Sequence, residues 1–375
     1  MKNIVVCLAI MLGGITSLVY ANQEQTAVKT IQPQFPILKS GKWGYIDSTG
    51  RITIEARFEK GSEFSEGYAR VQSKGKYGFV NGNGKVVIDF QFDDAGSFSE
   101  GLAIVRVKDK WGYIDKMGKL LKPASFRGGN AFSEGLAVVC TEGPKNAQRG
   151  LVYSEGTVAS ESGAKCGYVD QKGHFIIKAN LEGAVTGVYT KNARIITGIT
   201  SPYNFSEGLA PLFIDGKWGY IDRNGKVVIQ AKYEGPFYSP SPFKEGLAAV
   251  QIDGKWGYID KMGNLVIKPQ YEAAKSFANG LALVSIESKG GYIDKTGTII
   301  IQPKFDDAYP FSEGLAAVQI DGKWGYIDRQ GNLVIKPQFD DIEPFSAGLA
   351  RVYMGNTFAY VDKMGAVIWR SSPLK

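Results

Sequence analysis

The sequence predicts an all-β protein made of tandem, three-stranded antiparallel repeat units, and three observations lead to that prediction. One strand-forming phrase recurs along the chain, glycine-containing turns follow it, and aromatic residues return at the same place in each copy. The clearest copy spans 322–335, where Trp, Tyr and Ile favour strands. Residues 328–331 form the expected turn, in which Gly331 is free to adopt positive φ. A fixed repeat predicts an array of small units in place of a single compact fold.

The glycine that follows the aromatic residue marks each copy of the phrase. Successive markers are 34, 34, 55, 52, 38, 34, 34 and 34 residues apart. The wide spacings place two insertions in the fourth unit, near 141–165 and 179–204, and a smaller one at 238–242. The markers are Gly44, Gly78, Gly112, Gly167, Gly219, Gly257, Gly291, Gly325 and, in the last copy, Ala359.

One unit consists of three expected strands, 247–252, 255–260 and 264–268. Asp253-Gly254 between the first two is a strong signal for a two-residue hairpin turn. Pro269 ends the third strand because proline cannot donate a hydrogen bond to a neighbouring strand. This frame predicts about nine units over residues 31–369.

The shape of the array has two alternatives, an open solenoid-like form and a closed propeller-like ring. Thirty-four residues is short for a four-stranded propeller blade, which favours the open form. Residues 31–35 copy 335–339 and therefore read as the tail of a missing unit. That additional strand is expected either to cap the end of an open array or to close a ring by pairing with the last unit.

The first residues are typical of an export signal. Lys2 supplies the positive start, residues 4–19 are apolar, and Ala21 is the small residue that cleavage requires. We therefore expect a signal peptide over 1–21, a loose segment over 22–30 and a polar tail over 370–375. The mature protein is expected in the periplasm, outside the cell or on its surface, with no transmembrane segment after cleavage.

Composition narrows the function classes. Of the 375 residues, 44% are hydrophobic and 12% aromatic, which is enough to bury a core. A formal net charge of +7 fits weak attraction to anionic surfaces or polymers. Because an exported protein rarely meets nucleic acid, we expect no nucleic-acid partner.

The repeated phrase resembles the bacterial WG repeat, also written KWG, over residues 31–369. It reads Gly-Lys-Trp-Gly-Tyr-Ile-Asp, then Leu-Val-Ile-Lys-Pro-Gln-Phe after a glycine turn, then Phe-Ser-Glu-Gly-Leu-Ala. The resemblance implies an all-β repeat array and no general catalytic role. The hairpin is also similar, more loosely, to cell-wall-binding repeats, in which aromatic residues hold sugar or choline. Four units replace the Trp, with Tyr77, Cys166, Gly290 and Phe358.

Cys140 and Cys166 are predicted to form a disulfide. Alignment of the fourth unit on the sixth places them at Gln251 and Trp256, which face each other across the hairpin. Directly opposed residues on antiparallel strands lie within the Cα range that a disulfide requires. Export supplies an oxidising compartment. The bond would close the 141–165 insertion; the alternative is a pair of buried thiols.

The recurring aromatic residues are the candidate binding residues. A ladder of exposed rings could stack against sugars, whereas the competing interpretation is a core in which each ring packs against the next unit. The candidates are Trp43, Trp111, Trp218, Trp256, Trp324, Tyr45, Tyr113, Tyr220, Tyr258 and Tyr326.

The sequence contains few residues of the types that catalytic and metal sites require. His174 is the single histidine, and only two cysteines remain after the predicted cleavage. The acidic pairs, such as Asp306-Asp307, lack the dense alternating oxygens of a calcium loop. We expect no catalytic residue, no metal and no cofactor.

The expected function is that of an exported, non-catalytic binding or scaffold protein, monomeric, with an extended β surface. Its partner would be a cell-envelope polysaccharide or a protein. Two alternatives stay open, a hydrolase-type enzyme with its site in the fourth-unit insertions and a purely structural envelope protein.

Overall fold

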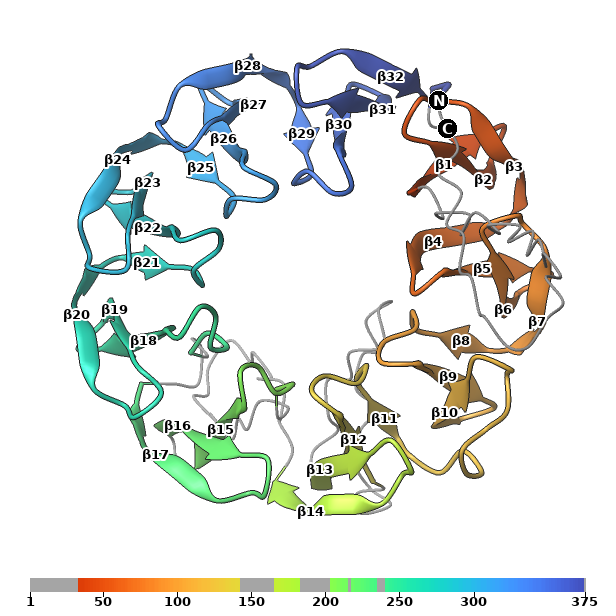
Figure 1. Ribbon diagram of the computed structural model, residues 1–375, viewed down its shortest axis with the longest axis horizontal. Helices are drawn as coiled ribbons and strands as arrows, with labels where there is room; N and C mark the ends of the chain where they lie inside the picture. Colours follow the sequence, from red (N-terminus) through yellow and green to blue (C-terminus); the bar gives the residue numbers. More distant parts are fainter. Residues whose placement is uncertain (1–32, 142–164, 183–202, 215–216, 235–239, 374–375) are drawn as a thin grey trace, which may run out of the picture. The chain divides into compact units, whose positions relative to one another are not determined.

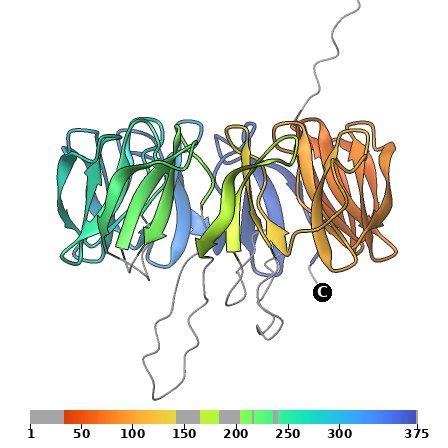
Figure 2. The same cartoon turned by 90° about the horizontal axis from the view of Figure 1, so that it is seen from below.

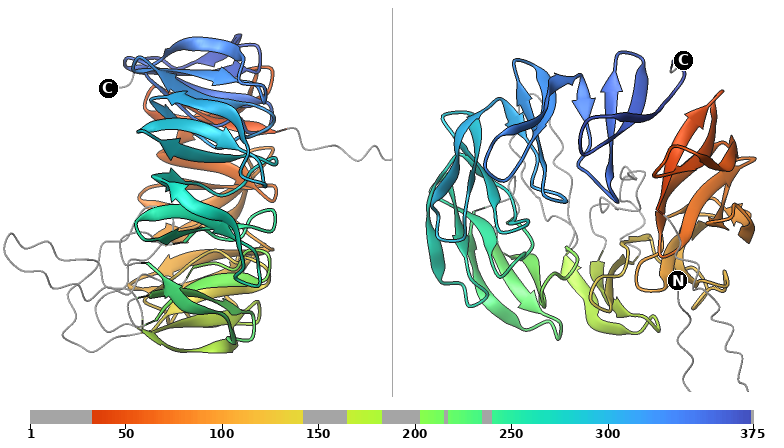
Figure 3. Two further views of the ribbon diagram at one scale, coloured as in Figure 1. Left: turned by 90° about the vertical axis from the view of Figure 1, so that its left-hand side faces the viewer. Right: turned by 45° about the horizontal axis from the view of Figure 1, so that its top comes forward.

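The computed structural model describes residues 33–141, 165–182, 203–214, 217–234 and 240–373. Within these residues the regular structure is all β, and it forms nine separate antiparallel sheets. The sheets follow one another around a ring like the blades of a propeller (Figure 1). Figure 2 and the left view of Figure 3 show this ring from the side, with the strands running between its two faces.

Each blade is a sheet built from one contiguous segment of the chain. Blade 1 holds β1 (Gln34–Lys39), β2 (Lys42–Asp47) and β3 (Ile52–Phe58); blade 2 holds β4 (Lys60–Ser65), β5 (Tyr68–Ser73), β6 (Lys76–Asn81) and β7 (Val86–Phe92); blade 3 holds β8 (Asp94–Ala95), β9 (Leu102–Val107) and β10 (Lys110–Asp115). Blade 4 holds β11 (Gly128–Gly129), β12 (Leu136–Cys140), β13 (Lys165–Asp170) and β14 (Phe175–Glu182); blade 5 holds β15 (Leu209–Ile214), β16 (Lys217–Asp222) and β17 (Val227–Tyr233); blade 6 holds β18 (Ala248–Ile252), β19 (Lys255–Ile259) and β20 (Leu265–Tyr271). Blade 7 holds β21 (Ala273–Ala274), β22 (Ala282–Ile286), β23 (Lys289–Ile293) and β24 (Ile299–Phe305); blade 8 holds β25 (Asp307–Ala308), β26 (Ala316–Ile320), β27 (Lys323–Ile327) and β28 (Leu333–Phe339); blade 9 holds β29 (Asp341–Ile342), β30 (Leu349–Met354), β31 (Thr357–Asp362) and β32 (Val367–Arg370).

The ring is closed, so the open solenoid-like array favoured by the sequence is wrong. Nine apolar clusters join neighbouring blades, and one of them joins blade 9 to blade 1. At that junction the Tyr360 hydroxyl donates a 2.9 Å hydrogen bond to the carbonyl of Pro36. Thirty-four residues are enough for a blade because most of the linkers supply a short innermost strand, such as β25, at no extra length.

The start of the array also differs from the sequence expectation. Phe35 pairs with Ile46 in blade 1, just as Ala316 pairs with Ile327 in blade 8. β1 is therefore the first strand of a complete hairpin, not the tail of a missing unit or a strand that zips the ring. No sheet combines strands from the two chain ends, so side-chain packing closes the ring among the described residues.

The marker glycine is required by a bulge in the outer strand. In blade 6, Tyr258 pairs with Ile267 and Trp256 pairs with Tyr271, so the outer strand carries extra residues opposite Gly257. A Cβ on Gly257 would lie 2.5 Å from the carbonyl oxygen of Ile267 and 2.8 Å from the nitrogen of Pro269. The column tolerates one alanine, Ala359, because this residue pairs directly with Arg370 and no such bulge lies opposite it.

Candidate functional site

The recurring tryptophans lie in the cores between blades. Trp111 and Trp218 are 2% and 0% exposed, and Trp256 and Trp324 are 9% and 6% exposed. Trp43 is half-buried and packs on the cluster between blades 1 and 2. The binding role proposed for these tryptophans stays a prediction. Their rings face the adjoining blade.

The recurring tyrosines link their blades to the following blade through their hydroxyl groups; in blade 2, Phe79 holds this position and has no hydroxyl. Every candidate tyrosine is at most 3% exposed. Each hydroxyl donates to a backbone carbonyl of the innermost segment of the following blade, at 2.6–3.0 Å. The pairs are Tyr45 with Ser62, Tyr113 with Asn130, Tyr220 with Ser241, Tyr258 with Lys275 and Tyr326 with Glu343.

Alkaline pH should unfold the ring, because burial raises the pKa of the Tyr45, Tyr258 and Tyr326 hydroxyls above the usual 10.0. A folded-state pKa above the unfolded value means that stability is complete below pH 10 and declines as the pH rises further. We expect a thermal unfolding temperature that is level up to about pH 10 and falls steeply beyond it. Tyr258→Phe should show a weaker decline, whereas an unchanged slope in this variant would contradict the assignment.

Acidic residues in the inner turns clamp neighbouring blades. Glu245 takes a φ of 54°, a conformation that non-glycine residues rarely adopt. Its carboxylate accepts a hydrogen bond from the Gly280 amide at 3.1 Å and pairs with the Lys295 ammonium at 3.1 Å. Desolvation raises the pKa of Glu245, but these hydrogen bonds outweigh it and lower the pKa overall.

The clamp recurs at three further junctions, but Asn279 replaces the glutamate between blades 7 and 8, and the glutamate and the lysine are both replaced where the ring closes. Glu66, Glu207 and Glu313 make the same two contacts to the following blade. At the junction of blades 9 and 1, Ala347 stands in place of the glutamate and Ser48 stands in place of the lysine. This role was not predicted from the sequence, although Glu66, Glu245 and Glu313 each stand in a Glu-Gly turn that is followed by a lysine 50 residues later.

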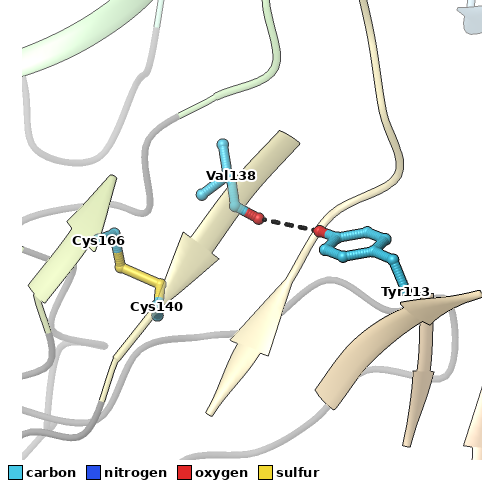
Figure 4. The surroundings of a disulfide bond; sticks show 4 residues. All are labelled: Tyr113, Val138, Cys140 and Cys166. Atoms are coloured by element: carbon cyan, nitrogen blue, oxygen red, sulfur yellow. Dashed lines mark hydrogen bonds between the residues drawn. A yellow bond between two sulfur atoms is a disulfide. The ribbon is translucent and has the colours of Figure 1, made fainter. Parts of the chain in front are cut away.

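Cys140 and Cys166 form a disulfide, as the sequence predicted (Figure 4). They pair directly on β12 and β13, and their Cα atoms lie 4.1 Å apart. Both side chains are buried between blades 4 and 5, at the position that Trp and Gln hold in other blades. The 142–164 insertion that the bond spans lies outside the described residues.

Loss of this disulfide should lower the free energy of unfolding by about 3 kcal/mol, because the bond restricts the unfolded chain. The measurement is urea denaturation of the oxidised protein with and without a reducing agent. The Cys140→Ser, Cys166→Ser double variant should match the reduced protein and should not respond to the reducing agent. Two free thiols in the oxidised, denatured mature protein would end the proposal.

No group of side chains for metal binding is assembled within the described part of the chain. Groups of three or more His, Cys, Asp or Glu side chains able to hold a metal are absent there. His174 is exposed and lies 3.5 Å from the carboxylate of Asp170 in a turn. The second Asp of the acidic pairs bonds the next amide, as in Asp307 with Ala308. In the same residues, no helix has the length and apolar character needed to cross a bilayer.

The outer strands of blades 4–9 present an apolar band that the sequence analysis missed. The band lies on the outside of the ring, where β14, β17, β20, β24, β28 and β32 are the last strands of their sheets (Figure 1). Its side chains are 37–50% exposed. They are Phe175, Ile176, Val228, Leu265, Val266, Ile299, Ile300, Leu333, Val334 and Val367.

Several solved structures resemble this ring at low sequence identity. A eukaryotic initiation factor is 14% identical, with a TM-score of 0.48 over 90% of this chain and 84% of that one. BamB from Moraxella catarrhalis is 12% identical, with a TM-score of 0.45 over 82% and 92% of the two chains. Hsv2p from Kluyveromyces lactis is 9% identical, with a TM-score of 0.41 over 75% and 97%. No curated protein matches the sequence.

A family model described as "WG containing repeat" matches the chain seven times. The matches cover 43–77, 77–111, 111–143, 218–256, 256–289, 291–324 and 324–358. Each match begins or ends at the Trp column, whose rings lie in the junctions between blades, and together the matches span more than half of the sequence. The chain therefore belongs to the WG-repeat family, and its repeats close into a nine-bladed β-propeller.

Proposed function

We propose that this propeller is an exported, non-catalytic scaffold that binds another protein. The observation that carries the proposal is the use of the aromatic columns inside the ring. A sugar-binding ladder requires exposed ring faces, yet four of the five tryptophans are at most 9% exposed and the candidate tyrosine hydroxyls already donate to the backbone. This arrangement supports a protein partner over a cell-envelope polysaccharide.

The repeated contacts between blades also support a scaffold role. A packed core holds each blade against the next, a tyrosine hydrogen bond is added at eight of the nine junctions, and the complete carboxylate clamp is added at four. Such a body keeps its surface in one arrangement and can present it without an ordering cost on binding. The proposal includes no catalytic step.

Two binding measurements on the purified protein test the proposed partner class. The protein is applied to a glycan array and, separately, photo-crosslinked to proteins of the cell-envelope fraction of the source organism. We expect a crosslinked protein that the heat-unfolded chain does not capture, together with no retention on the array. Saturable glycan binding that survives Trp256→Phe, with no crosslinked protein, would overturn the choice of a protein partner.

Export has its own test, because residues 1–32 lie outside the described part of the chain. We expect the mature protein to begin near Asn22 and to be recovered from the periplasm or the medium. N-terminal sequencing of the protein from fractionated cells measures both. An intact Met1 in a cytoplasmic fraction would contradict export.

A further inference from the structure

We propose that the apolar band on blades 4–9 is the docking surface for an extended, acidic polypeptide that wraps around the outside of the ring. This inference rests on the proposed function, since it names the surface and the chemistry of the protein partner. The band repeats at one position. In blades 6–8 the two residues before the buried isoleucine of each outer strand are exposed and apolar, as in Leu333 and Val334 before Ile335.

Charge on the outer strands distinguishes these blades from the first two. The buried isoleucine is followed by an acid in blade 1, Glu55, and in blade 2, Asp89. In blades 4–9 each outer strand that carries the band holds one exposed cation shortly after that position, and among the side chains described on these strands none is an exposed acid. The cations are Lys178, Lys232, Lys268, Lys304, Lys336 and Arg370.

These cations are available to a partner. Within the described residues, the ion pairs are made by other lysines and arginines, such as Lys289 and Lys323 with the acids that follow the outer strands. Lys232 and Lys304 lie over the rings of Tyr233 and Phe305, which keeps their charges along the strand. Regular cations beside apolar pairs fit a ligand with alternating carboxylates and apolar side chains.

The shape of the surface favours an extended chain over other occupants. The band follows the convex outside of a ring over six consecutive blades (Figure 1). A flat membrane or a second ring can touch such a curve at only one or two blades at a time. A second copy would also bring lysine against lysine, which is unfavourable. An extended polypeptide can follow the curve and contact every blade, so that its affinity accumulates over the repeated contacts.

The test uses fluorescein-labelled peptides of alternating valine and glutamate in a series of lengths, with fluorescence anisotropy as the readout. Binding to the full-length mature protein should strengthen with peptide length. The triple variant Val266→Thr, Ile300→Thr, Val334→Thr should weaken binding by about tenfold or more. Threonine suits this position, because Thr53 already occupies it in blade 1.

A charge reversal provides the second variant and its control. Lys268→Glu, Lys304→Glu, Lys336→Glu should abolish binding of the glutamate peptide and create binding of the matching lysine peptide. The control reverses three exposed lysines away from the band, Lys60, Lys244 and Lys275. It changes the net charge equally and should bind the glutamate peptide nearly as the wild type does.

Each other outcome overturns the assignment. Equal binding by the wild type and the threonine variant, or no binding by the wild type, removes the band as the site. A dimer in sedimentation equilibrium that the threonine variant loses identifies a second copy as the occupant. Loss of binding to vesicles of phosphatidylcholine and phosphatidylglycerol in that variant identifies a membrane. If the envelope protein is still crosslinked by both band variants, the proposed function stands and this docking surface fails.

Discussion

Gly291→Ala should lower the free energy of unfolding by about 4 kcal/mol, whereas Gly290→Ala, one residue earlier, should leave it unchanged or raise it slightly. A Cβ on Gly291 would lie 2.7 Å from the nitrogen of Pro303 and 2.8 Å from the carbonyl oxygen of Ile301. Both are backbone atoms of the outer-strand bulge, so the strand itself would have to move. A Cβ on Gly290 would meet side-chain atoms of Leu283 and Ala308 at 3.4 and 3.5 Å, which is ordinary contact.

Urea denaturation followed by tryptophan fluorescence measures both variants. The two substitutions add the same methyl group to neighbouring positions of β23, so differences in composition and helix or strand preference cancel. Equal destabilisation by the two variants would refute the bulge as the reason for the marker glycine. Removal of the Cβ at the equivalent place in blade 9, by Ala359→Gly, should be mildly destabilising, because that blade has no such bulge and glycine adds freedom to the unfolded chain.

Tyr360→Ala should destabilise the protein as much as Tyr326→Ala, by about 4 kcal/mol each. Tyr326 lies at a junction between blades that are consecutive in the chain, where it bonds Glu343 at 2.6 Å and packs on Phe345. Tyr360 lies at the closing junction, where it bonds Pro36 at 2.9 Å and packs on Phe35 with ring centroids 5.4 Å apart. In a closed ring the two side chains are buried alike, at 0% and 3% exposure.

The comparison of these two variants measures ring closure directly. In an open array Tyr360 would face solvent, and its replacement would cost well under about 1 kcal/mol. Equal losses in the urea denaturation of both variants are expected. A loss confined to Tyr326→Ala would show that blade 9 does not pack on blade 1 in solution. Tyr360→Phe, which keeps the ring and removes the hydroxyl, should cost about 1 kcal/mol.

The closing junction is expected to be the weakest of those between neighbouring blades. It retains the apolar cluster and the tyrosine hydrogen bond of the other junctions. It lacks the carboxylate clamp, since Ala347 stands where Glu313 stands in blade 8. Local opening of the ring, as measured by hydrogen exchange, should therefore begin there.

The hairpins, the repeat and the disulfide could be predicted from sequence because each depends on neighbours in the chain. A two-residue turn sets the pairing of the strands that flank it, which placed Cys140 opposite Cys166 despite the insertion between them. The marker glycine was recognised from its recurrence, although its reason, the bulge opposite it, emerged only from the strand register.

The candidate binding residues show where that local reasoning stops. Period-two alternation placed Trp256 and Tyr258 on one face of the hairpin, but it could not say what covers that face. The adjoining blade covers that face, so the rings are buried and the Tyr258 hydroxyl donates a hydrogen bond to the carbonyl of Lys275. The exposed apolar pairs went unnoticed for the same reason, because Leu265-Val266-Ile267 reads as one buried strand until the outer edge of the sheet is known.

By itself, the sequence determined an all-β chain of repeated hairpins, its membership of the WG-repeat family and the pairing of its two strand cysteines. Only the tertiary structure decided that the units close into a ring, that the first strand completes blade 1 and that the tryptophans pack against the adjoining blade. The physical reason is the distance along the chain over which each interaction acts. Turn conformation and strand alternation act over a few residues, whereas closure depends on the tilt between blades added up around the whole ring and on contacts such as Tyr360 with Pro36, which are 324 residues apart.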